Sequence, residues 1–213
     1  MSLAPLLRHA RVIERRAPLE EDELAALGPL PEETQRFADK RRDEFLRGRH
    51  AARLVLAELG VEVGLLPIGA DRAAVWPEGT VGAITHCTGF AAAAAGPRAL
   101  LRGVGIDAQP IAEERSLAAL RRTSTPEEIA RLGDRPELTA RTLVFAAKEA
   151  LYKALAPTVG SYFGFEAARV EAATNETCTL RLTRTLHAEL VAHRTFLVRW
   201  SVADGLAFAA VEW

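Results

Sequence analysis

The chain has 213 residues and a formal net charge of −1, which excludes a global basic field of the kind that attracts nucleic acid. Hydrophobic residues make up 49% and charged residues 26%, an ordinary globular composition with enough length for two halves that share a core. The two cysteines lack metal-ligand spacing, and the sequence shows no secretory signal pattern, so we expect a cytoplasmic protein. Every apolar run is short, so we expect no stable membrane insertion.

The N-terminal third begins with a proline-punctuated segment, residues 1–33, for which we expect irregular structure. Apolar residues then recur at about 3.6-residue spacing over residues 32–59, a pattern that predicts one long helix with Gly60 as its C-terminal cap. Arginines are dense in this helix, and Arg41 and Arg49 fall roughly on one face. They suit a phosphate clamp, although a solvated helix face explains them equally simply.

A β-hairpin is predicted next, with strands at residues 81–87 and 90–95 joined by a tight turn. The second strand is rich in alanine, which is a poor strand former. His86 lies in the first strand beside Thr85, and a histidine here can donate to a phosphate or serve as a structural residue. Arg72, in the loop before the hairpin, is a further candidate for phosphate binding.

A short strand at residues 104–107 ends in the first candidate acid, Asp107. Acids at strand ends often face a cleft, but Asp107 can also cap the turn that leads to Pro110. Gln109 lies two residues further on, so on an extended chain it points to the same side and can offer a neutral carbonyl oxygen.

Residues 109–140 are polar and loop-rich, and Thr125-Pro126-Glu127-Glu128 has the form of a capping box that opens a short helix to Leu132. Residues 141–155 then predict a helix that ends near Pro157. This helix carries Lys148, Glu149 and Lys153. A carboxylate can hold a divalent cation and ammonium groups can hold phosphate, but a Glu–Lys pair four residues apart is also common on exposed helices.

The C-terminal part predicts strands at residues 168–172, 177–186, 195–203 and 206–213, with Asp204-Gly205 as the turn of the last hairpin. Each half therefore has a long helix and a hairpin with an alanine-rich strand, which indicates a faint internal repeat. Two unrelated helices with ordinary spacing would also give this pattern. We predict an α+β fold, a pseudo-dimer of two similar halves (1–105 and 106–213), each a helix packed on an antiparallel sheet.

Four segments carry a family resemblance when they are taken in order. An arginine-rich helix, W-P-x-G-x-V-G-A-I-T-H-C, V-G-I-D-A and F-A-A-K-E-A-L-Y-K-A together resemble the 4′-phosphopantetheinyl transferases. The similarity is to the single-chain, pseudo-dimeric Sfp-type class and, within it, to the enterobactin synthetase component D branch. It runs from about Lys40 to Phe165, and the final hairpin also fits.

This resemblance implies an enzyme that transfers the phosphopantetheine arm of coenzyme A to a serine of an apo acyl or peptidyl carrier protein, releasing 3′,5′-ADP. It implies a monomer and favours nonribosomal peptide or siderophore synthesis, with polyketide and fatty-acid carriers also open. By similarity, Asp107 and Glu149 would hold Mg²⁺, Glu149 would take the serine proton directly or through water, and Lys148 and Lys153 would neutralise phosphate charge. The coenzyme A contacts implied are Arg41, Arg49, Arg72, Thr85 and His86, in addition to both lysines.

Two departures from the family pattern bear on these expectations. Many relatives have Glu where this chain has Gln109, and an amide is a weaker magnesium ligand than a carboxylate, although Glu113 or Glu114 could compensate. Relatives tend to have Pro at the position of Ala74, and its replacement could loosen the loop that holds Arg72. Two rival functions stay open: a coenzyme A-binding homologue with little transferase activity, and an anion-binding scaffold protein.

Overall fold

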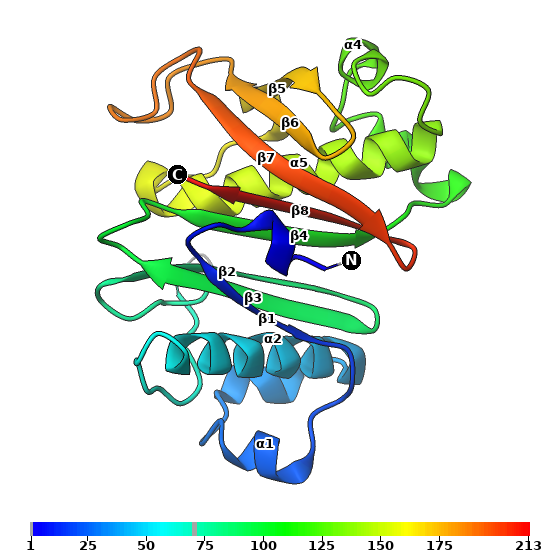
Figure 1. Ribbon diagram of the computed structural model, residues 1–213. Coiled ribbons are helices and arrows are strands. Elements are labelled where there is room, and N and C mark those ends of the chain that lie inside the picture. Colours follow the sequence, from blue (N-terminus) through cyan, green and yellow to red (C-terminus); the bar gives the residue numbers. More distant parts are fainter. Residues whose placement is uncertain (1, 70–71) are drawn as a thin grey trace.

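The computed structural model describes residues 2–69 and 72–213. In these residues the strands form two antiparallel sheets, one of three strands in the order β1-β3-β2 and one of five in the order β4-β8-β7-β6-β5 (Figure 1). The strands are β1 (Arg11–Arg15), β2 (Thr80–Cys87), β3 (Phe90–Pro97), β4 (Val104–Pro110), β5 (Ala168–Ala173), β6 (Thr177–Leu182), β7 (Thr195–Ala203) and β8 (Leu206–Glu212). The α-helices are α1 (Glu21–Ala25), α2 (Asp39–Ala57), α3 (Leu117–Leu120), α4 (Pro126–Ala130) and α5 (Glu137–Val159).

Each sheet is covered on its outer face by one long helix, which confirms the predicted α+β fold of two helix-on-sheet halves. Helix α2 packs on β3 and its neighbours, and α5 packs on β4, β8 and β7 (Figure 1). A hydrophobic cluster lies between the inner faces of the two sheets. It is built from residues of β2, β3, β4 and β8. Strand β4 spans the predicted boundary between residues 105 and 106, and the whole strand pairs with β8.

The alanine-rich strand β3 is explained by its position between two layers. Ala93 and Ala95 contact the core under α2, whereas Ala92 and Ala94 face the cluster between the sheets. All four are completely buried. Low strand propensity is outweighed here because small side chains let both neighbouring layers approach the strand closely.

Gly105 sets how closely β4 approaches α5. A Cβ atom at this position would overlap the carbonyl oxygen of Ala150 on the helix. Gly105 and Asp107 lie on the same face of the strand, and Ala150 is adjacent to Glu149 along α5. The missing side chain therefore brings the backbone that carries Asp107 close to the turn of helix that carries Glu149.

Several predicted elements differ from the structure, and the strand predicted at residues 104–107 continues as β4 to Pro110. The long helix expected over residues 32–59 is divided: a 3-10 helix (Glu32–Arg36) is separated from α2 by Phe37 and Ala38, whose ψ angles of 140° and 149° are extended. The Phe37 ring packs on Phe45, with centroids 5.6 Å apart, which favours this break. Residues 1–33, expected to be irregular, contribute β1 and α1, and β6 ends at Leu182 instead of residue 186.

Helix α5 is longer than predicted at both ends. It begins at Glu137 and continues past Pro157 to Val159, where Gly160 caps it with a φ of 69°. Pro157 has no N–H to donate to the Lys153 carbonyl oxygen, and the helix ends two residues after it. The predicted turn at Asp204 and Gly205 is confirmed, with φ values of 52° and 73° at the two residues.

Glu212 at the end of β8 fastens the N-terminal segment. Its side chain is 7% exposed and accepts hydrogen bonds from the backbone N–H groups of Arg8, His9 and Ala10 at 3.0, 2.8 and 2.7 Å.

We expect Glu212→Ala to lower the free energy of unfolding by about 2 kcal/mol, because three donors lose a charged acceptor. Urea denaturation would measure this. The exposed Glu176→Ala is the control, and an equal midpoint for the two variants would contradict the prediction.

In residues 2–69 and 72–213, no helix combines the length and the apolar character that crossing a membrane requires.

Candidate active site

Asp107 is the centre of a polar cluster between the two sheets and α5. The residue is 2% exposed. Its Oδ1 atom accepts from Lys153 Nζ at 2.7 Å and from the Thr85 hydroxyl at 3.1 Å, and its Oδ2 atom accepts from Gln109 Nε2 at 2.9 Å. Lys153 also donates to the Ile106 carbonyl oxygen at 3.0 Å. The acid therefore belongs to this cluster and does not cap the turn at Pro110.

Thr85 and Gln109 support Asp107. The Thr85 hydroxyl accepts from the backbone N–H of Ala108 at 3.0 Å while it donates to Asp107, which ties β2 to β4. Gln109 points to the same side of β4 as Asp107, as its spacing predicts, but the amide nitrogen faces the carboxylate. The structure thus places both residues as hydrogen-bond donors to the acid.

Glu149 is the second acid, and α5 places it one turn before Lys153. Partial burial raises the pKa of its carboxyl, the negative charge of Asp107 raises it further, and Lys153 opposes both. Asp107, Glu149 and Lys153 are therefore electrostatically coupled, although they come from opposite sides of a strand–helix contact. The structure brings these three predicted residues together.

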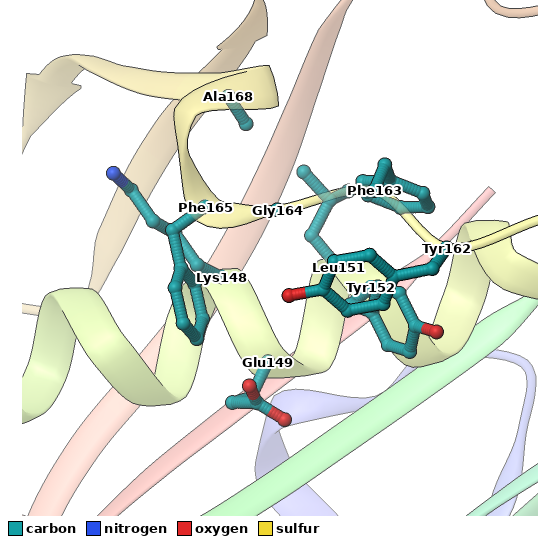
Figure 2. Close-up of a pocket in the computed structure, with 9 residues that line it drawn as sticks. All are labelled: Lys148, Glu149, Leu151, Tyr152, Tyr162, Phe163, Gly164, Phe165 and Ala168. Carbon is teal, nitrogen blue, oxygen red and sulfur yellow. The ribbon is translucent and has the colours of Figure 1, made fainter. Parts of the chain in front are cut away.

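Lys148 is placed differently from the other predicted residues. Figure 2 shows its ammonium group pointing away from the Glu149 carboxylate. Its Nζ atom lies 2.8 Å from Glu128 Oε1 and donates to the Thr123 carbonyl oxygen at 2.9 Å, and the side chain is 2% exposed. Consecutive helical residues point about 100° apart, so Lys148 does not reach the acidic cluster on the side that Glu149 faces.

A pocket of about 360 Å³ lies between the two halves and is here called the central pocket. Its walls come from α2, from β2 and the loop before it, and from α5. Among its lining residues are Phe45, Arg49, Trp76, Gly82, His86, Tyr152 and Lys153. Gly82 allows the Trp76 ring to lie directly against the strand, because a Cβ atom there would meet the indole. The pocket therefore joins the arginine-rich helix to the Asp107–Lys153 pair.

Arg49 is the notable cation of the central pocket. It is 4% exposed, its guanidinium lies 5.0 Å from the centroid of the Phe45 ring, and its Nη1 atom has no hydrogen-bond partner among the described residues. Burial lowers its pKa to about 10. A buried guanidinium with an unused donor is costly by itself, so this arrangement fits a site built for an anionic ligand.

The other predicted cations line a neighbouring pocket of about 780 Å³, which shares Phe45, Arg72 and His86 with the central pocket. Arg41 stacks over Phe37 at 4.8 Å. His86 Nδ1 lies 3.4 Å from Glu44 Oε2, and burial lowers the pKa of this histidine although Glu44 opposes the shift. Arg72 is exposed and has a φ of 67°. Arg41, Arg72 and His86 thus line one pocket.

A third pocket, of about 230 Å³, adjoins Glu149 and is here called the aromatic pocket (Figure 2). One wall is α5 from Lys148 to Tyr152, and the other is the segment from Tyr162 to Ala168. Tyr152 also lines the central pocket, and its ring lies 4.9 Å from that of Phe163. A ligand with a charged end and a slender apolar end could therefore pass Glu149 from one pocket into the other.

The acidic cluster fits a divalent cation in its chemistry. Asp107 and Glu149 provide hard carboxylate oxygens, and Mg²⁺ typically takes one or two carboxylates together with water and substrate phosphates. Burial, and after it the negative charge of Asp107, raises the pKa of Glu149, and a bound cation would favour the charged carboxylate against both. No group of three or more His, Cys, Asp or Glu side chains with metal-site geometry occurs in the part of the chain that the structure describes.

Sequence reasoning missed several residues that shape the site. The sequence gives Glu128 only as a helix-capping residue and Trp76 only as the start of the W-P-x-G motif, and it gives no role to Glu44. The carboxylate of Glu44 pairs with His86, and the carboxylate of Glu128 pairs with Lys148. None of these contacts has a signal in local spacing, because the partners are 20 to 42 residues apart.

Two family models match successive parts of the chain. A family model described as the 4′-phosphopantetheinyl transferase N-terminal domain matches residues 30–96, and that of the 4′-phosphopantetheinyl transferase superfamily matches residues 103–209. The 4′-phosphopantetheinyl transferase PptT of Mycobacterium tuberculosis is 37% identical over 204 residues, which cover 87% of this chain and 86% of the relative. Npt of Nocardia iowensis, also named a 4′-phosphopantetheinyl transferase, is 36% identical over 82% of this chain and 83% of its own length. Enterobactin synthase component D of Salmonella typhi is 32% identical over 76% of this chain and 67% of its own length.

Proposed function

The chain belongs to the 4′-phosphopantetheinyl transferase superfamily, and from this premise we propose that it transfers the 4′-phosphopantetheine group of coenzyme A to a serine of an apo acyl or peptidyl carrier protein. The products are the holo carrier protein and 3′,5′-ADP. The similarity to enterobactin synthase component D supports a carrier of siderophore or other nonribosomal peptide synthesis. We further propose a monomer, since the two halves of one chain provide both sides of the site.

The observation that carries this proposal is the buried, partly unpaired guanidinium of Arg49 in a pocket that is also lined by Lys153, the ion-pair partner of Asp107. Coenzyme A is rich in phosphate at one end and carries a slender arm at the other. The phosphates would be bound by Arg41, Arg49, Arg72 and His86, and the arm would enter the aromatic pocket. Lys148 is not included among these ligands because Glu128 engages its ammonium group.

The transfer step needs positioning and charge neutralisation more than covalent chemistry by the protein. The serine oxygen attacks the phosphorus that carries the pantetheine arm, and the bond to the departing 3′,5′-ADP breaks. Glu149 takes the serine proton, directly or through water, and Lys153 stabilises the negative charge of the phosphates. A Mg²⁺ ion held by Asp107 and Glu149 would supply further charge neutralisation on the pyrophosphate, with Gln109 and Thr85 keeping Asp107 oriented.

The acceptor would approach from the side of Gln109. A pocket of about 370 Å³ opens there, bounded by the loop after β4, by α3 and by Phe145 of α5. It is lined by apolar residues such as Ile111 and Leu120, with Arg115 among its polar residues. Arg115 is paired there with Glu113 at 2.9 Å, so the apolar lining of this pocket, and not a free cation, would provide the contact with the part of the carrier protein that bears the serine.

The test is the intact mass of an apo carrier protein after incubation with this protein, coenzyme A and Mg²⁺. We expect a gain of one phosphopantetheine group, and loss of that gain when EDTA removes the metal. A transfer rate unchanged by EDTA would contradict the metal requirement.

Failure with several acyl and peptidyl carriers, while coenzyme A still binds, would contradict the transferase proposal for the chain as it stands. Gln109→Glu would then separate two causes. Restored transfer would assign the defect to the amide at this position and support the alternative of a coenzyme A-binding homologue with an impaired metal site. No transfer in that variant would point to a different acceptor.

A further inference from the structure

The transfer mechanism leaves one buried ion cluster without a role. Glu128 on α4 is 2% exposed, and both of its carboxylate oxygens are fully engaged. Oε1 accepts from Lys148 Nζ at 2.8 Å and from the Val170 N–H at 3.0 Å, and Oε2 accepts from the Thr125 N–H at 2.9 Å and from Arg169 Nη1 at 3.1 Å. We call Glu128, Lys148 and Arg169 the buried clamp; its two central residues, Glu128 and Lys148, are buried, and the Arg169 side chain is 41% exposed.

The clamp joins three elements that are far apart in the sequence. Glu128 belongs to α4, Lys148 to the middle of α5, and Arg169 to the beginning of β5. Burial by itself would raise the pKa of Glu128, but its contacts with Lys148 and with backbone N–H groups hold the pKa below the usual range. The carboxylate therefore stays charged, and a charged group in this position needs all of its partners.

The clamp lies at the junction of the two walls of the aromatic pocket. Lys148 is adjacent to Glu149 on the helical wall, and its aliphatic stem lines the pocket (Figure 2). Arg169 directly follows Ala168, the last residue of the opposite wall. Phe165 on that wall packs on Phe145 of α5, with centroids 5.5 Å apart. The same carboxylate thus holds both walls.

We propose that Glu128 is a positioning residue of the transferase, which holds the aromatic pocket at a fixed width and orients the turn of α5 that carries Glu149. The inference rests on the proposed function. Lys148 acts in it as the structural partner of Glu128 and not as a phosphate ligand. To reach a phosphate, its ammonium group would have to leave a buried carboxylate without its main countercharge and leave the Thr123 carbonyl without its donor.

Three variants test the clamp: Glu128→Gln, Lys148→Met and the double variant. We expect each single change to lower kcat about tenfold to a hundredfold, since small displacements of reacting groups have effects of this size. The dissociation constant of coenzyme A, measured by calorimetry, should stay within about threefold, because the phosphate-binding cations are elsewhere. The double variant should recover part of the lost kcat, because it removes both charges of the buried pair together.

A second readout does not depend on activity. Hydrogen–deuterium exchange of the segment 160–168 should become faster in Glu128→Gln and in Lys148→Met, because the pocket wall is no longer fastened to α5. Glu137→Gln is the matched control: it removes another ion pair of α5, with Arg141, away from the pocket. It should leave kcat and this exchange unchanged.

Two results would overturn the clamp. One is a tenfold or larger loss of coenzyme A affinity in Lys148→Met with none in Glu128→Gln, which would make Lys148 a ligand of coenzyme A. The other is unchanged exchange of segment 160–168 in Glu128→Gln. If the unmodified protein transfers nothing to any carrier, the proposed function fails, but the exchange experiment still decides whether the clamp holds the pocket wall.

Discussion

Glu149→Gln is expected to lower kcat for phosphopantetheine transfer about a thousandfold at saturating coenzyme A and Mg²⁺. Glutamine keeps the shape of the side chain, but it cannot accept the serine proton and it removes one of the two negative charges at the Asp107 cluster. Coenzyme A affinity should change only a few fold, since in the proposed binding mode other residues, in the central pocket, hold the phosphates. Time courses of carrier mass give kcat, and calorimetry gives the dissociation constant.

The control for this change is Glu58→Gln, which removes an exposed carboxylate just after α2. It should match the unmodified protein in both measurements. If Glu149→Gln kept kcat within tenfold of the unmodified protein, Glu149 would not take the proton, and a water molecule or a group of the acceptor would have to do so.

The second large effect concerns binding. Arg49→Met is expected to weaken coenzyme A binding about a hundredfold, which is the effect of losing strong charge-assisted hydrogen bonds to phosphate. The same change should leave the thermal unfolding temperature of the ligand-free protein equal or higher. Methionine retains the apolar stem but removes a buried guanidinium whose pKa burial has already lowered to about 10. Calorimetry and thermal denaturation measure the two effects.

Arg42→Met is the matched control, because Arg42 lies on the same helix but is exposed and does not line the central pocket. It should change neither affinity nor unfolding temperature. A normal coenzyme A affinity in Arg49→Met would show that this guanidinium does not bind the substrate. A clear loss of stability would show that its contact with Phe45 outweighs the cost of its burial.

Local signals in the sequence were sufficient where neighbouring residues decide the structure. The pair Asp204-Gly205 predicts the final hairpin because both positions need a positive φ, and the Thr125–Glu128 capping box predicts the start of α4 because its hydrogen bonds are local. The spacing of Asp107 and Gln109 placed both on one side of β4. Local signals failed for β1, which becomes a strand only because β3 offers it an edge.

Local signals in the sequence predicted only part of the candidate site. The residues Asp107, Glu149, Lys153, Arg49 and His86 were found because their types and order resemble a known family. The approach of Asp107 to Glu149 and Lys153 depends on Gly105, whose missing side chain allows β4 to lie close to α5. That contact joins residues more than forty positions apart, and no local pattern specifies it.

By itself, the sequence determined the greater part of the two long helices, the hairpins β2–β3 and β7–β8 and the chemical types of the candidate site residues, because these follow from periodicity, turn chemistry and short motifs. Only the tertiary structure decided which way neighbouring side chains face. Lys148 and Glu149 are adjacent in the sequence, yet the ammonium of Lys148 is buried against Glu128 while Glu149 adjoins the Asp107 cluster. The physical reason is that the direction in which a buried charged side chain points is decided by its partners on other elements. Packing brings those partners together only in the folded chain.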